Sequence, residues 1–181
     1  VKSDGSIWFT DPTYGILSDY EGYQSAPEQP VHGVYRIDGQ SGDIRLMVGD
    51  FVQPNGLAFS PDESRLYIAD SGASHDPDVP RHIRAFVVED GGLTLRDLGP
   101  FAVIDNGIPD GFRVDTEGWV WCSAADGVQV FDDTGKLCGK IRVPQPVSNL
   151  TFGGPRRNRL FITATTSLYA LYVTARGAQT P

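Results

Sequence analysis

The sequence predicts an all-β protein of the β-propeller class from three observations: its composition, an internal repeat and the spacing of that repeat. With 181 residues, of which 40% are apolar and 21% charged, the chain can bury a substantial core and is expected to form one globular unit. Its 21 glycines and 13 prolines indicate many short strands joined by turns. Helix is therefore expected to be a minor component.

Four segments of the chain align as copies of one repeat, each a polar turn followed by an apolar strand. They are DGSIWFTD (4–11), DESRLYIAD (62–70), EGWVWCSA (117–124) and RRNRLFITA (156–164), with the central aromatic residues Trp8, Tyr67, Trp121 and Phe161. These aromatic residues are 59, 54 and 40 residues apart. That spacing is close to the ~40 to 50 residues of a four-stranded propeller blade once loop insertions are allowed. We therefore expect the four aromatic side chains to be buried between blades.

The other strands of each blade can be placed around these copies. A short innermost strand precedes three copies, at LAFS (57–60), FRVD (112–115) and LTFG (150–153). A further strand follows every copy, at HGVYRID (32–38), RHIRAFVV (81–88), GVQVFD (127–132) and SLYALYV (167–173). An outer strand follows in three of them, at DIRLMV (43–48), LTLRDL (93–98) and KLCGKIRV (136–143). We expect residues 1–181 to form a single, N-terminally incomplete propeller domain of about four blades.

Two of the predicted loops should lie on the face where the innermost strands begin, because the strands of a blade alternate in direction. Residues 11–31 form an unusually long, tyrosine-rich connection, which is typical of a functional lid. Residues 70–80 form the second loop. We expect Tyr14, Asp70 and His75 from these loops to bind substrate. The alternative interpretation is that Tyr14 packs the loop, Asp70 caps it and His75 is a surface turn residue.

Two side chains with oxygen donors begin neighbouring innermost strands. Asn55 and Asp110 each precede the acidic residue of the next turn, Asp62 or Glu117, by seven residues. Amide and carboxylate oxygens suit a hard divalent cation, Ca²⁺ first, with Mg²⁺, Mn²⁺ or Zn²⁺ as alternatives. The competing interpretation, favoured on spacing alone, is that Pro-Asn-Gly and Pro-Asp-Gly are turn tripeptides that tolerate left-handed backbone. Ser148 stands at the corresponding place in the last copy, where we expect a turn residue.

Five segments resemble, in the same order, the senescence-marker-protein, gluconolactonase and luciferin-regenerating-enzyme family. They are DGSIWFTDPTYG, QPNGLAFSPDESRLYIAD, RHIRAF, PDGFRVDTEGWVWCS and VSNLTFGGPRRNRLFIT, and they extend over essentially the whole chain. The resemblance implies a six-bladed propeller, of which this chain is the C-terminal part, with one axial divalent cation held by a Glu, two Asn and an Asp. Asn55 matches the second Asn and Asp110 matches the Asp. The resemblance places the other Asn and the Glu upstream of Val1.

The same resemblance implies an enzyme that hydrolyses sugar lactones or related esters. A bound cation would polarise the lactone carbonyl while a carboxylate takes a proton from the attacking water. The resemblance assigns that catalytic carboxylate to Asp110, with Asn55 as a neutral metal ligand. Two alternatives stay open: an organophosphate or arylester hydrolase on the same scaffold, and a non-catalytic propeller that only binds its partner.

Charge and composition exclude several classes of partner. A net charge of −8 and a pI near 4.7 argue against nucleic acid and anionic membranes, which need clustered Lys and Arg. No apolar run approaches the ~18 residues that span a bilayer. The first residues show no signal-peptide pattern, which favours the cytoplasm, although a targeting peptide upstream of Val1 would not be visible. Cys122 and Cys138 are expected to be free thiols. The expected partner is a small-molecule lactone; the oligomeric state is not specified.

Overall fold

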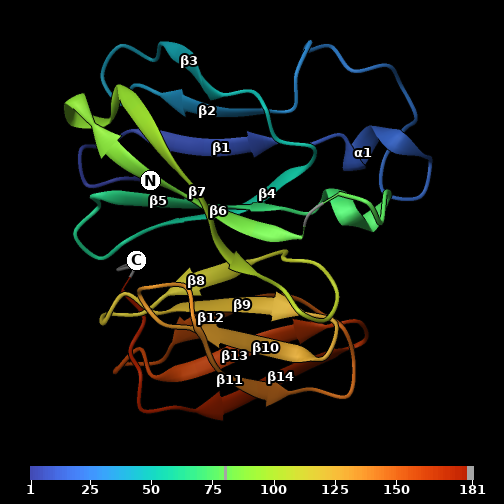
Figure 1. Cartoon of the computed structure of the whole chain (residues 1–181), viewed down its shortest axis with the longest axis vertical. Helices are drawn as coiled ribbons and strands as arrows, with labels where there is room; N and C mark the ends of the chain where they lie inside the picture. The colour runs from blue at the N-terminus through green and yellow to red at the C-terminus, as the bar shows by residue number, and fades with distance from the viewer. Residues whose placement is uncertain (80, 179–181) are drawn as a thin grey trace.

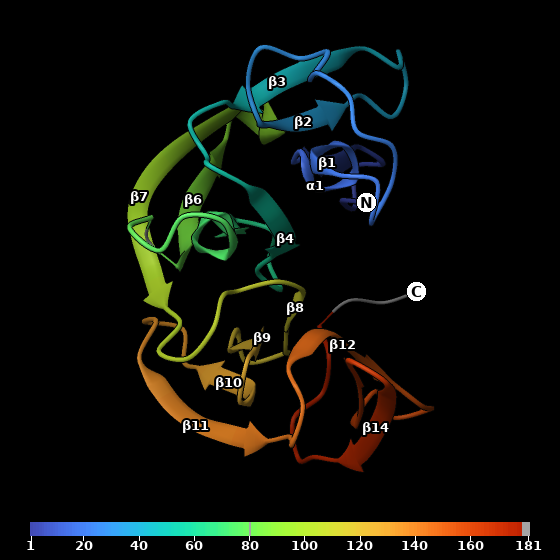
Figure 2. The same cartoon turned by 90° about the vertical axis from the view of Figure 1, so that its right-hand side faces the viewer.

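The computed structural model describes residues 1–79 and 81–178, and it is built from antiparallel β-sheets (Figure 1), which follow one another along an arc (Figure 2). The first sheet contains β1 (Ile7–Asp11), β2 (Gly33–Ile37) and β3 (Ile44–Val48). The second contains β4 (Pro54–Phe59), β5 (Arg65–Asp70), β6 (His82–Glu89) and β7 (Thr94–Val103). The third contains β8 (Phe112–Val114), β9 (Val120–Ala124), β10 (Gly127–Phe131) and β11 (Leu137–Arg142). The fourth contains β12 (Val147–Gly153), β13 (Arg159–Ala164) and β14 (Ser167–Tyr172).

Each sheet is a meander in which neighbouring strands in sequence pair with each other, which confirms the all-β class and the blade assignment. Figure 2 shows β4, β8 and β12 on the concave side of the arc, with β3, β7 and β11 on its outer side. The described helical segments are short: α1 (Tyr14–Leu17), η1 (Gly72–Ser74) and η2 (Asp90–Gly92). The first two lie in the loops of residues 11–31 and 70–80, on the side where the innermost strands begin.

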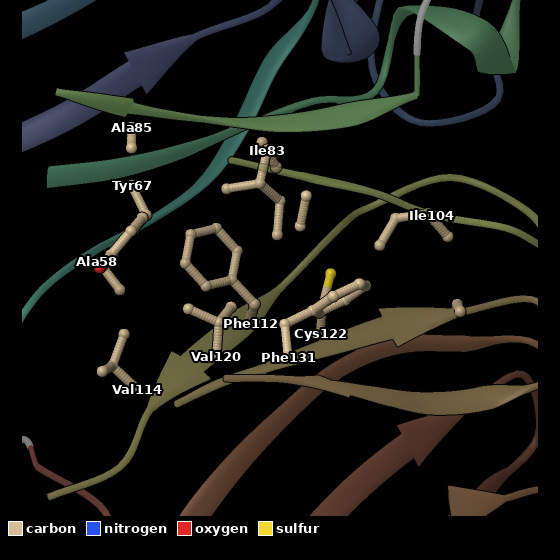
Figure 3. Close-up of a cluster of buried hydrophobic side chains, with 13 residues drawn as sticks. Ala58, Tyr67, Ile83, Ala85, Ile104, Phe112, Val114, Val120, Cys122 and Phe131 are labelled. Atoms are coloured by element: carbon tan, nitrogen blue, oxygen red, sulfur yellow. The ribbon is translucent and has the colours of Figure 1, made fainter. Parts of the chain in front are cut away.

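The blades are joined by apolar side chains that face one another across the interface. In the central interface, Tyr67 and Ile83 of the second blade meet Phe112, Val120 and Cys122 of the third (Figure 3). Burying an aromatic or branched side chain contributes about 1.5–3 kcal/mol, so this cluster fixes the two blades against each other. Because β4 and β8 emerge from that interface, their first residues are held in a defined relative position.

Three of the four repeat aromatics are buried, as expected: Trp8, Tyr67 and Trp121. The expectation is wrong for Phe161, which is only partly buried. Phe161 lies on a face of β13 that packs against the Arg159 guanidinium, 5.0 Å from its ring centroid, and no further sheet among the described residues covers it. An aromatic column is buried only where a second sheet stacks on it.

The two cysteines are free thiols, as expected. Cys122 is buried in β9 and Cys138 is exposed in β11. Burial strongly raises the pKa of the Cys122 thiol, so it stays protonated and behaves as a small apolar core residue.

Candidate functional site

The structure brings Asn55 and Asp110 together at one cavity. Its volume is 490 Å³, and it lies between the long loop after β1, the loop after β5 and the starts of β4 and β8. The lining residues are Tyr14, Leu17, Ser18, Tyr20, Glu21, Asn55, Ser74, His75, Ile108 and Asp110. Asn55 and Asp110, which are 55 residues apart in the sequence, thus contribute an amide and a carboxylate to the same cavity.

The backbone at Asn55 and Asp110 is not the left-handed turn of the competing interpretation. Neither residue, nor the glycine that follows it, has a positive φ in the described part of the chain. The glycines serve close packing instead. A Cβ on Gly56 would lie 2.3 Å from the carbonyl oxygen of Asp110, and a Cβ on Gly111 would lie 2.2 Å from Oδ1 of Asn149. The small residue therefore allows neighbouring innermost strands to approach each other beside the candidate site.

Ser71 links the two candidate ligands, and sequence reasoning missed it. The Nδ2 of Asn55 donates a hydrogen bond to the Ser71 hydroxyl over 3.1 Å. That hydroxyl donates in turn to the carbonyl oxygen of Pro109, the residue before Asp110. Ser71 is fully buried. Ser71 therefore holds the Asn55 amide in one orientation relative to the Asp110 backbone. The only sequence feature that pointed to Ser71 is its position directly after the strand β5.

Asp110 is a partly buried carboxylate whose surroundings do not fully compensate its charge. Burial raises the pKa of Asp110 above the usual aspartate value, and the charge of Glu21 in the long loop adds to this shift. Hydrogen bonding from Asn55 and from the Gly111 amide opposes it and lowers the pKa. A carboxylate whose pKa is raised in this way is a stronger base than an exposed aspartate.

Tyr14 and His75, both expected to bind substrate, line the same cavity and contact each other. Their ring centroids are 5.4 Å apart. The Tyr14 hydroxyl donates to the carbonyl oxygen of Ser71 over 3.0 Å, so the short helix α1 of the long loop is fastened to the loop after β5. Ser74, which sequence reasoning did not single out, lies between Tyr14 and His75 and hydrogen-bonds both.

Asp70, the third residue expected to bind substrate, is placed differently. It is buried and is not among the residues that line the cavity. Its carboxylate accepts hydrogen bonds from the backbone amides of Val52, Gln53 and Gly72, at 3.0, 2.9 and 3.0 Å. This arrangement matches the capping alternative, because Asp70 holds the loop that carries Ser71, Ser74 and His75.

The fourth blade places the side chain of Asn149, and not that of Ser148, against the neighbouring innermost strand, although the Ser148 carbonyl accepts the Gly111 amide over 2.9 Å. The Asn149 amide lies against Gly111, whereas the Ser148 hydroxyl is directed to Thr163. The spacing could have shown this, since Asn149 also stands seven residues before the polar turn that begins at Arg156. A bulge between Val147 and Asn149 shifts the register there. Asp110 also borders a second cavity, of 440 Å³, on the side of this blade.

The donor atoms at the site fit a hard divalent cation. The Asn55 nitrogen donates to the Ser71 hydroxyl and to the Asp110 carboxylate, so its Oδ1 is the amide atom that remains available to bind a cation. Oxygen donors of this kind are the ligands that Ca²⁺ and Mg²⁺ prefer. Within residues 1–79 and 81–178, no group of three or more His, Cys, Asp and Glu side chains is arranged to bind a metal. Asn55 and Asp110 are thus the two candidate oxygen ligands that the sequence singled out and that the described residues bring to one cavity.

No helix among the described residues has the length and apolar character required to cross a bilayer.

Comparison with known proteins gives several relatives that are named as lactone hydrolases. The chain is 32% identical over 172 residues to a gluconolactonase of Zymomonas mobilis, covering 90% of this chain and 46% of that protein. It is 30% identical over 164 residues to the lactonohydrolase oryH of Aspergillus oryzae, covering 81% of this chain and 35% of that protein. The chain therefore spans less than half the length of these two curated relatives.

A solved structure agrees with this relationship. The structure of a gluconolactonase from Xanthomonas campestris superposes with a TM-score of 0.86 at 42% identity, covering 95% of this chain and 55% of that one. The model of the SMP-30/gluconolactonase/LRE-like region matches residues 1–166. That match includes all four repeat copies and both candidate ligands. The chain therefore belongs to the SMP-30/gluconolactonase/LRE-like family.

Proposed function

We propose that this protein is a hydrolase that opens a sugar lactone at the cavity beside Asn55 and Asp110. One observation carries the proposal: a partly buried carboxylate of raised pKa and an oriented amide share a 490 Å³ cavity with polar groups from two loops. A cavity of this size suits a small-molecule ligand. The names of the relatives, gluconolactonase and lactonohydrolase, support a lactone as the substrate class.

A divalent cation is part of this proposal, with Ca²⁺ preferred on donor chemistry and Mg²⁺, Mn²⁺ or Zn²⁺ as alternatives. Asn55 Oδ1 and the Asp110 carboxylate would hold it. When bound, a cation at this place would withdraw charge from the lactone carbonyl and from the oxygen that leaves. The neutral Asn55 ligand would leave more of the positive charge available to the substrate than a second carboxylate would.

Asp110 is the proposed general base. Its carboxylate accepts a proton from the attacking water as the water oxygen bonds to the carbonyl carbon. When the ring C–O bond breaks, the same carboxyl group returns the proton to the leaving oxygen, so that the product is a hydroxy acid. In the metal-free protein burial raises the pKa of Asp110, whereas a bound cation would lower it, so the proposed proton transfer rests on the position of the carboxylate at the cavity. Tyr14 and His75, from the two loops that line the cavity, provide the proposed substrate contacts.

Hydrolysis of three substrates by the full-length protein would test the proposal. We expect turnover of a sugar lactone that is lost with a chelator and restored by Ca²⁺. Preferred turnover of a phosphotriester or an aryl ester would instead support the organophosphate or arylester alternative. Binding of a lactone without hydrolysis, at any metal concentration, would favour the non-catalytic propeller. Lactone turnover that is unaffected by chelation would contradict the metal-dependent mechanism.

A further inference from the structure

Tyr14, Ser74 and His75 form a continuous hydrogen-bond chain along one wall of the candidate cavity. The Tyr14 hydroxyl lies 3.0 Å from the carbonyl oxygen of Ser71 and 3.1 Å from the Ser74 hydroxyl. The Ser74 hydroxyl lies 2.7 Å from Nδ1 of His75. All three side chains line the cavity that contains Asn55 and Asp110. The loop carrying Ser74 and His75 is fixed from behind by the Asp70 carboxylate, which accepts the Gly72 amide.

The direction of each hydrogen bond in this chain follows from counting protons. The Ser71 carbonyl can only accept, so Tyr14 must donate its single hydroxyl proton to it. The contact between Tyr14 and Ser74 then needs the Ser74 proton. With that proton committed, the Ser74 oxygen can only accept from His75, whose Nδ1 must carry a hydrogen. This is the one arrangement that satisfies all three contacts at once.

A neutral histidine with its hydrogen on Nδ1 has a lone pair on Nε2. No described residue hydrogen-bonds Nε2 of His75, and the ring borders the cavity. The Tyr14 ring, tilted by 40° to the imidazole, restricts how that ring can turn. In its neutral form His75 therefore presents a hydrogen-bond acceptor, and not a donor, to whatever occupies the cavity.

We propose that Nε2 of His75 accepts a hydrogen bond from a hydroxyl group of the lactone, and that Ser74 and Tyr14 are positioning residues that set its tautomer. This inference rests on the proposed lactone hydrolysis and deepens it, because it assigns selection for hydroxylated lactones to one side chain. A carbonyl or ether oxygen cannot donate to Nε2, so a lactone without ring hydroxyls loses the interaction. His75 acts on recognition, whereas Asp110 acts on the chemical step.

The tautomer can be measured without any substrate by ¹⁵N NMR of His75 in the full-length protein, since the protonated and unprotonated ring nitrogens have distinct shifts. We expect hydrogen on Nδ1 in the neutral ring. Ser74→Ala should mix the two tautomers, and Ser74→Thr, which keeps the hydroxyl, should restore the first. Hydrogen on Nε2 in the unmodified protein would overturn the donor order and with it the proposal.

Selectivity is measured as the ratio of kcat/KM for a polyhydroxylated lactone to that for an unsubstituted lactone of the same ring size. His75→Phe keeps a ring against Tyr14 but removes the acceptor, and should lower this ratio by about 3- to 10-fold, the usual worth of one neutral hydrogen bond, mainly through KM. Leu17→Ala, which removes apolar bulk from the same cavity, should leave the ratio unchanged.

Equal losses on both lactones in His75→Phe would overturn the proposal. An unmodified protein that hydrolyses neither lactone would overturn the proposed function itself and the role of His75 in substrate selection. The NMR measurement would still decide the donor order in that case, so the two failures are distinguishable.

Discussion

The two ends of β8 carry aspartates in opposite situations. Asp110 stands before the strand and Asp115 follows it, five residues later. Asp115 is only 2% exposed, and its carboxylate accepts the Glu117 and Trp119 amides at 2.9 Å each and the indole Nε1 of Trp121 at 2.8 Å. Asp110 is less buried but has fewer compensating partners, so its pKa is raised.

Cavity size alone would favour the other end of this strand. A cavity of 540 Å³ adjoins Asp115, whereas the one shared by Asn55 and Asp110 measures 490 Å³. At the larger cavity the carboxylate is occupied by hydrogen bonds that close the turn between β8 and β9. A carboxylate whose acceptors are filled stabilises the fold, while one with spare capacity beside an oriented amide can take a cation or a proton.

The same isosteric substitution at both ends should separate these roles. The largest effect is expected for Asp110→Asn in the full-length protein: it keeps an oxygen at the site but removes the base, so kcat for lactone hydrolysis should fall by about 10² or more. Steady-state kinetics at saturating metal would measure it. Near-normal turnover of this variant would demote Asp110 to a metal ligand or a structural residue.

At the other end, Asp115→Asn should lower the free energy of unfolding by about 2 kcal/mol, because an amide NH₂ would face the Trp121 indole N–H or leave a backbone amide without an acceptor. Urea unfolding followed by tryptophan fluorescence would measure the change. The kcat of the folded variant should stay within about twofold, since Asp115 does not line the candidate cavity. A stability unchanged from the unmodified protein would show that the turn does not depend on this carboxylate.

Asn55→Ala should have an intermediate effect, on metal affinity. Removing a residue that only hydrogen-bonds a metal ligand typically lowers metal affinity by about tenfold or more. Loss of a direct ligand should therefore weaken the binding of Ca²⁺ by at least about tenfold. Calorimetric titration of the chelator-treated full-length protein would measure this, and excess metal should partly restore turnover. Ser71→Ala is the matched control: it keeps Oδ1 of Asn55 but removes its orientation, and should weaken binding less. A larger loss in Ser71→Ala would contradict the ligand role of Asn55.

Most of the fold could be predicted because each blade repeats a local pattern. Trp8, Tyr67 and Trp121 recur in equivalent strands, and strands of one blade are neighbours in sequence. The partial exposure of Phe161 could not be predicted in this way, since the burial of this side chain depends on whether a second sheet covers its face of β13. The six-blade count rests on family resemblance and stays a prediction.

The candidate site was only partly predictable. Asn55 and Asp110 could be found because both occupy the same place in the repeat. For Ser71 the sequence offered only its place directly after a strand, and for Ser74 it offered no signal, because their roles come from hydrogen bonds between segments that are far apart in sequence. The same limitation applies to Asp70, whose residue type and loop position fit both a substrate contact and a cap, and only its three backbone partners separate these roles.

The smallest effect is expected for Asp110→Asn in the unfolding experiment that tests Asp115→Asn. Burial raises the folded-state pKa of Asp110, so the stability associated with its protonated form is lost as pH rises through that pKa. At neutral pH the ionised carboxylate therefore adds no net stability, and a neutral amide of the same shape keeps an oxygen for the Gly111 amide. In metal-free protein the free energy of unfolding should change by less than about 0.5 kcal/mol. A loss as large as that of Asp115→Asn would mean that Asp110 is also a structural carboxylate, and the contrast between the two ends of β8 would fail.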